Sequence, residues 1–128
     1  MRAVRIETLW RDIEATWGLL TPDAVMKALG LPEIDVDAVS RMRTDGQLLA
    51  VEREGAYVYP GFQFESGHVA PVVPVLVELA RDVGWSQNEL VIWLCSPSGY
   101  FGGDRPVEHL DEADELAEKA RDAATVEW

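Results

Sequence analysis

The chain has 128 residues, of which 48% are hydrophobic and 27% charged, a composition typical of a soluble globular protein. No apolar run approaches the roughly 20 residues of a membrane-spanning helix, and residues 1–20 lack the apolar block of a signal peptide. The single cysteine, Cys95, excludes an intramolecular disulfide. We therefore expect a cytoplasmic protein that does not contact membranes.

Acidic residues outnumber basic ones by 23 to 11, which gives a net charge of −12. The charge is uneven, because residues 1–60 carry −3 and residues 61–128 carry −9. Such a second half is repelled by phosphate backbones and attracted to basic proteins. Solubility alone explains the same charge equally well.

Three helices are predicted in the first half. The first covers residues 6–17, where apolar side chains recur on one helical face. Thr21-Pro22 then begins a helix that ends at Gly30, since a hydroxyl N-cap and an early proline favour a start and glycine favours a stop. After the connector 31–37, Asp35 or Asp37 caps a third helix that ends at Gly46, and its apolar stripe is Val36, Val39 and Met42.

A hairpin follows the third predicted helix. Residues 48–51 and 56–59 are apolar, aromatic or β-branched, and the turn Arg53-Glu54-Gly55 lies between them. Residues 62–70 show no clear period and are interpreted as a packed linker. We therefore place a boundary here, between a module of residues 1–64 and a module of residues 65–128.

Two short helices followed by a two-stranded ribbon have the order of a winged helix-turn-helix, whose second helix enters the major groove of DNA. The hairpin-tip residue would then meet a backbone phosphate. The alternative is a helical domain with a stray hairpin, in which the arginines are merely solvated. The predicted DNA-binding residues are Ser40, Arg41, Arg43 and Thr44 on the helix and Arg53 on the hairpin.

The second half is predicted to be helical, so the fold class is mainly α with one short hairpin. One helix is expected over 72–83, and a second is opened by a capping box from Ser86 to Glu89 and ended by Ser96-Pro97. A short helical turn over 106–110 follows, and Asp111 then caps a last helix whose inner face runs from Ala113 to Ala124.

No catalytic constellation stands out. Ser98, Asp104 and His109 can be combined into a triad on paper, as residues of most chains can. The glycine-rich stretch 98–104 lacks the lysine and hydroxyl of a phosphate loop, and two histidines with one cysteine do not make a common zinc site. We expect a protein that is not an enzyme and that holds neither cofactor nor metal.

Residues 90–110 resemble the toxin-binding domain of Xre/MbcA/ParS antitoxins. Residues 20–64, with Thr21-Pro22 and Leu29-Gly30, are similar to the winged, excisionase-like module that often precedes that domain. Together the two resemblances cover about residues 20–125. The positions that match the toxin-binding signature are Trp93, Leu94, Pro97, Gly102, Gly103, Pro106 and Leu110.

The resemblance implies an antitoxin that binds a RES-domain toxin, an enzyme that breaks down NAD⁺. The antitoxin's C-terminal domain would cover the entrance to the toxin's active site. A homodimer within a toxin–antitoxin complex would repress its own operon by binding operator DNA. The toxin-binding residues that follow from this interpretation are Tyr100, Phe101, Gly102, Gly103, Arg105, Pro106 and Trp128.

Two alternatives stay open from the residues alone. Tyr100 and Phe101 either anchor a partner or fold back onto Trp93 and close the core. The chain as a whole could instead be a stand-alone winged-helix transcription regulator, for which Arg41, Arg43 and Arg53 are decisive, or an adaptor for another basic protein.

Overall fold

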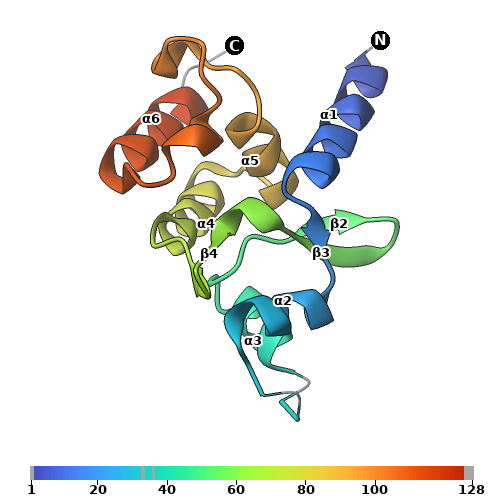
Figure 1. Cartoon of the computed structure of the whole chain (residues 1–128). Coiled ribbons are helices and arrows are strands. Elements are labelled where there is room, and N and C mark those ends of the chain that lie inside the picture. Colours follow the sequence, from blue (N-terminus) through green and yellow to red (C-terminus); the bar gives the residue numbers. More distant parts are fainter. Residues whose placement is uncertain (1, 33, 36, 126–128) are drawn as a thin grey trace.

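The computed structural model describes residues 2–32, 34–35 and 37–125, with side chains from Ile6 onward. The fold is mainly helical with a small winged sheet, as the sequence predicts (Figure 1). The first half contains α1 (Arg2–Thr16), β1 (Leu19–Leu20), α2 (Pro22–Leu29), α3 (Ala38–Thr44), β2 (Val51–Arg53) and β3 (Ala56–Pro60). The second half contains η1 (Gly61–Gln63), β4 (Phe64–Glu65), β5 (His68–Val69), α4 (Val72–Val83), α5 (Gln87–Leu94), η2 (Gly99–Phe101), η3 (Pro106–His109) and α6 (Ala113–Thr125).

The local signals for α2 are confirmed. The Thr21 hydroxyl accepts a hydrogen bond from the Ala24 N–H at 3.3 Å, and Gly30 ends the helix in the left-handed conformation at φ 65°. Asp37 occupies the N-cap position of α3 without a side-chain cap bond, while Asp35 pairs with Arg41 instead. Val36 of the predicted apolar stripe lies outside the described residues.

Strands β1, β3 and β2 form an antiparallel sheet in that order. The predicted hairpin is present, but its first strand begins later than expected, at Val51 rather than at Leu48. Arg53 pairs with Ala56 inside the ladder, so the turn itself is Glu54-Gly55, and both of its residues have positive φ. Strand β1, at residues that the sequence analysis left unassigned, pairs with β3 at Pro60 and Tyr59.

The interpretation of residues 62–70 as a linker is wrong, because the segment folds into a 3-10 turn and the hairpin β4–β5. Gln63 at its start is fully buried. Its amide nitrogen donates to the carbonyls of Leu49 (2.8 Å) and Pro60 (3.1 Å), and its amide oxygen accepts from the Leu49 N–H (2.8 Å). A buried amide that satisfies another segment's backbone fixes both segments together.

Two hydrophobic clusters lie on either side of the three-stranded sheet. We call α2, α3 and the smaller cluster the recognition unit, and α1, α4, α5, α6 and the larger cluster the helical unit (Figure 1). Trp10, Ile13 and Phe62 from the first half belong to the larger cluster. The clusters therefore do not divide the chain between residues 64 and 65. The smaller one contains Val25, Met26, Val39, Leu48, Ala50 and Tyr59.

Local signals of the second half are also confirmed. The Ser86 hydroxyl accepts from the Glu89 N–H, and the Glu89 carboxylate accepts from the Ser86 N–H, both at 3.0 Å. Cys95 is buried at the end of α5. Helix α6 packs against α4 through Leu116 and Ala120. None of the helices in the described part of the chain is long and apolar enough to cross a bilayer.

Candidate nucleic-acid interface

Helix α3 presents polar side chains at the surface of the recognition unit. Ser40, Arg41 and Thr44 are exposed and Arg43 is half-buried. The Thr44 hydroxyl donates to the Ser40 carbonyl at 2.9 Å, which holds the rotamer of that side chain. Of the five predicted DNA-binding residues, the four on α3 thus share one short helix at a single end of the molecule.

Arg41 is bound within the recognition unit. Its guanidinium donates to both carboxylate oxygens of Asp35, at 2.8 and 2.7 Å. This hydrogen bond, together with the negative charge of Asp35, raises the pKa of Arg41. The pair ties the α2–α3 connector to α3. It also neutralises one of the two cations on the helix.

Arg43 connects α3 to the hairpin. Its guanidinium carbon lies 4.0 Å from the centre of the Tyr57 ring, in cation–π geometry. Arg43 forms no ion pair with any carboxylate in the described residues. It is therefore the α3 cation whose charge stays uncompensated.

The two faces of the hairpin point to different parts of the molecule, since side chains alternate along a strand. Tyr57 lies on the side of α3, whereas Arg53 lies on the side of α1. The Arg53 guanidinium is 3.3 Å from both carboxylate oxygens of Glu7 and 4.9 Å from the Trp10 ring. The structure therefore does not bring Arg53 together with the α3 residues, and Arg53 is not free at the hairpin tip, as predicted, but paired with Glu7 at the end of β2.

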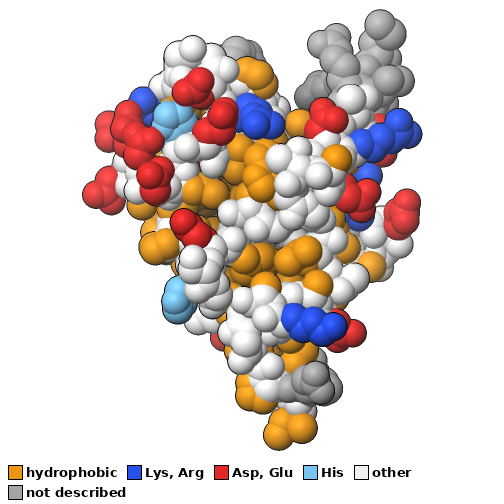
Figure 2. All heavy atoms as spheres, viewed as in Figure 1, with side chains coloured by type: hydrophobic (Ala, Val, Ile, Leu, Met, Phe, Trp, Pro, Cys, Tyr) orange, Lys and Arg blue, Asp and Glu red, His pale blue; other side chains and the backbone are white. Residues whose placement is uncertain are grey.

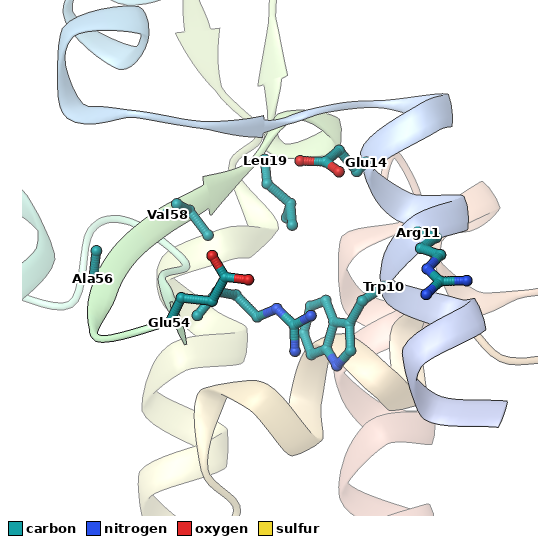
Figure 3. Close-up of a pocket in the computed structure, with 8 residues that line it drawn as sticks. Trp10, Arg11, Glu14, Leu19, Glu54, Ala56 and Val58 are labelled. Atoms are coloured by element: carbon teal, nitrogen blue, oxygen red, sulfur yellow. The ribbon is translucent and has the colours of Figure 1, made fainter. Parts of the chain in front are cut away.

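A pocket of about 320 Å³ lies between α1 and that second face of the hairpin (Figure 3). Its charged residues alternate in sign, with Arg11 and Arg53 against Glu14 and Glu54. Such an arrangement produces little net field for a phosphate. This pocket is therefore a poor place for a nucleic-acid backbone.

A second pocket, of about 330 Å³, lies between α3, the first face of the hairpin and the start of α5. We call it the α3–hairpin pocket. Its floor is fixed because the Ala50 N–H donates to Gln87 Oε1 (2.8 Å) and the Glu52 N–H donates to Asn88 Oδ1 (3.3 Å). The sequence analysis did not identify one basic residue of this pocket, Arg81. The lining residues are Arg43, Thr44, Ala50, Glu52, Tyr57, Arg81, Ser86, Gln87 and Asn88.

The predicted toxin-binding loop lies at the opposite end of the molecule, where acidic side chains gather over α6 (Figure 2). Tyr100 is 38% exposed, but Phe101 is buried at 8%. The Phe101 ring packs edge-on against Trp93 and stacks on His109 with 4.6 Å between ring centres. Of the two alternatives for these aromatics, the structure shows the fold-back for Phe101 and an accessible ring for Tyr100.

The other loop residues are held by their neighbours. Gly102 and Gly103 turn the chain at positive φ, 64° and 96°. Pro106 is buried, and the Arg105 guanidinium lies 5.1 Å from the Trp17 ring while pairing with Glu108. Trp128 lies outside the described residues.

His109 forms hydrogen bonds that hold the loop and is not part of a catalytic triad. Its Nδ1 bonds to Glu112 and its Nε2 lies 3.2 Å from Asp104. The hydrogen bond to Glu112, supported by Asp104, raises the pKa of His109. The Ser98 hydroxyl instead accepts from the Tyr100 N–H at 3.2 Å. Ser98, Asp104 and His109 therefore do not form a catalytic triad.

The comparisons with known proteins find similarity to a DNA-binding protein. The curated DNA-binding protein Rv2175c of Mycobacterium tuberculosis H37Rv is 35% identical to this chain over 74 residues. Those residues make up 57% of this chain, and they span only about half (49%) of the relative's length. No protein-family model matches the chain.

The NMR structure of Rv2175c superposes on this chain with a TM-score of 0.71 at 28% sequence identity. The superposition covers 85% of this chain and 82% of that one. The two folds are alike. The shared architecture therefore extends over most of the chain.

Proposed function

We propose that this protein binds double-stranded DNA, with α3 in the major groove and the β2–β3 hairpin beside it, and that it acts by binding rather than by catalysis. Its similarity to Rv2175c, a protein named for DNA binding, supports this role. The proposal is carried by Arg43, a cation at the junction of α3 and the hairpin that pairs with no carboxylate of the described residues. Exposed Ser40 and Thr44 on the same helix supply hydrogen-bonding groups for base edges.

The overall charge of −12 does not oppose this role, because most of it lies elsewhere. Residues 61–128 carry −9, and their acids cluster over α6, at the end away from α3 (Figure 2). At separations beyond a Debye length of about 10 Å at 0.1 M salt, these acids are largely screened from a bound duplex. Arg41 adds a second contact when it exchanges Asp35 for a phosphate.

The test is fluorescence anisotropy with a duplex from the chain's own upstream region, measured over a series of salt concentrations. Binding should weaken steeply with salt. Arg43→Ala should weaken it about tenfold, as loss of one charged DNA contact does. Arg53→Ala is the matched control, since it removes the same charge from the other face of the hairpin. Absence of binding by the wild-type protein at low salt would exclude the proposal.

A second candidate function is occlusion of a RES-domain toxin by a homodimer of this chain in the cytoplasm. It is favoured by one observation: Tyr100 is accessible on η2, which directly precedes the turn at Gly102 and Gly103. Aromatic side chains of this kind anchor interfaces. In this case operator binding through α3 would repress the operon.

Coexpression with a RES-domain protein encoded next to this chain tests the second candidate. The two should copurify, and the toxicity of the partner should disappear. Tyr100→Ala should weaken the complex, whereas Tyr57→Ala, which truncates an exposed tyrosine on the hairpin, should not. A partner that neither copurifies nor loses its toxicity would refute this role and leave DNA binding unaffected.

A further inference from the structure

Arg81 lies outside the recognition unit, but its side chain is at the surface of that unit. It belongs to α4, yet it lines the α3–hairpin pocket together with Arg43. A methyl group added at Gly46 would lie 3.4 Å from Nη1 and 3.5 Å from Nη2 of Arg81. The guanidinium therefore rests against the end of α3, in space that the missing side chain of Gly46 leaves open.

Neither arginine of this pocket is neutralised. The guanidinium of Arg81, like that of Arg43, has no ion pair or hydrogen bond with any described residue. Glu52 is the one acidic residue among those described as lining the pocket, so the pocket carries a net positive charge in a protein of net charge −12. Two unpaired guanidinium groups from different elements form a site suited to a phosphate, which accepts hydrogen bonds from both.

The position of the pocket fits a DNA backbone. When a helix occupies a major groove and a ribbon approaches the neighbouring minor groove, the strand that separates the two grooves runs between the helix and the ribbon. The α3–hairpin pocket lies between α3 and Tyr57 of the hairpin. We propose that Arg81 and Arg43 together hold one backbone phosphate of the bound duplex in this pocket, so that the helical unit contributes directly to DNA binding.

This inference rests on the proposed DNA-binding function and is tested by Arg81→Ala. The variant should bind duplexes about fivefold to tenfold more weakly near 0.1 M salt, and the slope of log affinity against log salt should fall by about 0.9, as expected for one lost phosphate contact. The loss should be equal for the upstream duplex and for a random-sequence duplex, since phosphates carry no sequence information. Arg81→Lys should keep most of the salt slope.

Three controls make the result specific. Arg11→Ala removes an exposed arginine of α1 that has no ion pair among the described residues and lies on the other side of the hairpin, and it should leave affinity unchanged. The double variant Arg43→Ala/Arg81→Ala should lose less than the product of the two single effects, because both groups act on one phosphate. A scan with single neutral methylphosphonates should find a position that weakens the wild-type protein and not Arg81→Ala.

The outcomes distinguish a failure of the shared phosphate site from a failure of DNA binding. If the wild-type protein binds DNA and Arg43→Ala weakens it while Arg81→Ala does not, the shared phosphate site is wrong and DNA binding stands. Equal losses of DNA affinity for Arg11→Ala and Arg81→Ala would show a general charge effect and would also overturn the shared phosphate site. If inorganic phosphate shifts the Arg81 side-chain NMR signal but no methylphosphonate position responds, the pocket takes a free anion and the DNA assignment fails. If the wild-type protein binds no duplex, both proposals fall.

Discussion

The recognition unit and the helical unit differ most in the size of their cores. Among the described residues, six buried side chains form the cluster beneath α2 and α3, and twenty form the cluster of the helical unit. Buried apolar area is the main source of stability. The helical unit therefore acts as a scaffold, and the recognition unit is stable because it shares the sheet and the Gln63 hydrogen bonds with it.

Both units contain paired and unpaired cations. In the helical unit Lys119 pairs with a nearby carboxylate, whereas Arg81 pairs with none of the described acids. In the recognition unit Arg41 likewise pairs with a carboxylate, whereas Arg43 pairs with none of the described acids. Net charge per half of the chain is thus a poor guide to where an anion binds, because pairing removes some charges and leaves others free.

The comparison of cores is tested most strongly by one leucine from each cluster. Leu76 and Leu48 are both fully buried, so Leu76→Ala and Leu48→Ala remove the same atoms. We expect Leu76→Ala to lower the free energy of unfolding by about 4 kcal/mol and Leu48→Ala by about 2 kcal/mol, since a small cluster collapses more readily around a cavity. Urea denaturation measures both values.

Cys95 reports which unit opens. Burial raises the pKa of its thiol to about 12, so the native protein holds almost no reactive thiolate at pH 8. Leu76→Ala should speed the labelling of Cys95 by a thiol reagent, whereas Leu48→Ala should leave labelling slow and instead speed amide exchange in α2 and α3. Equal labelling rates in the two variants would show that the units unfold as one.

The attachment between the units is tested by two glutamines that satisfy neighbouring backbone. Gln63 makes three hydrogen bonds at a fully buried site, and Gln87 makes one at a half-buried site. Gln63→Leu leaves the Leu49 N–H and carbonyl buried without partners, which should cost about 3 kcal/mol, against about 1 kcal/mol for Gln87→Leu. Thermal denaturation of both variants checks the order, and a reversed order would contradict this role for Gln63.

Local patterns predicted most of the fold, because their physics acts within a few residues. The Thr21 cap and the Ser86–Glu89 capping box were correct, since a cap bonds only to its own first turn. The side of the hairpin that Arg53 faces could not be predicted, because it depends on the strand pairing, and β2 begins three residues later than expected. The burial of Gln63 and the position of Arg81 against Gly46 depend on contacts between segments far apart in the sequence.

The smallest expected effect concerns the loop at the far end of the helical unit. The pKa of His109 is raised, mainly by the hydrogen bond to Glu112, so its ion pairs stabilise the fold fully below the ordinary histidine pKa of about 6.5 and are lost as pH rises through the raised value. The Tm of the wild-type protein relative to His109→Gln should therefore fall as the pH rises above about 6.5 and through the raised pKa of His109. His68→Gln is the control variant, because His68 is solvent-exposed. Because the other charges are common to both proteins, the difference isolates His109, and a difference that stays constant or grows with pH would show that its role is packing against Phe101 alone.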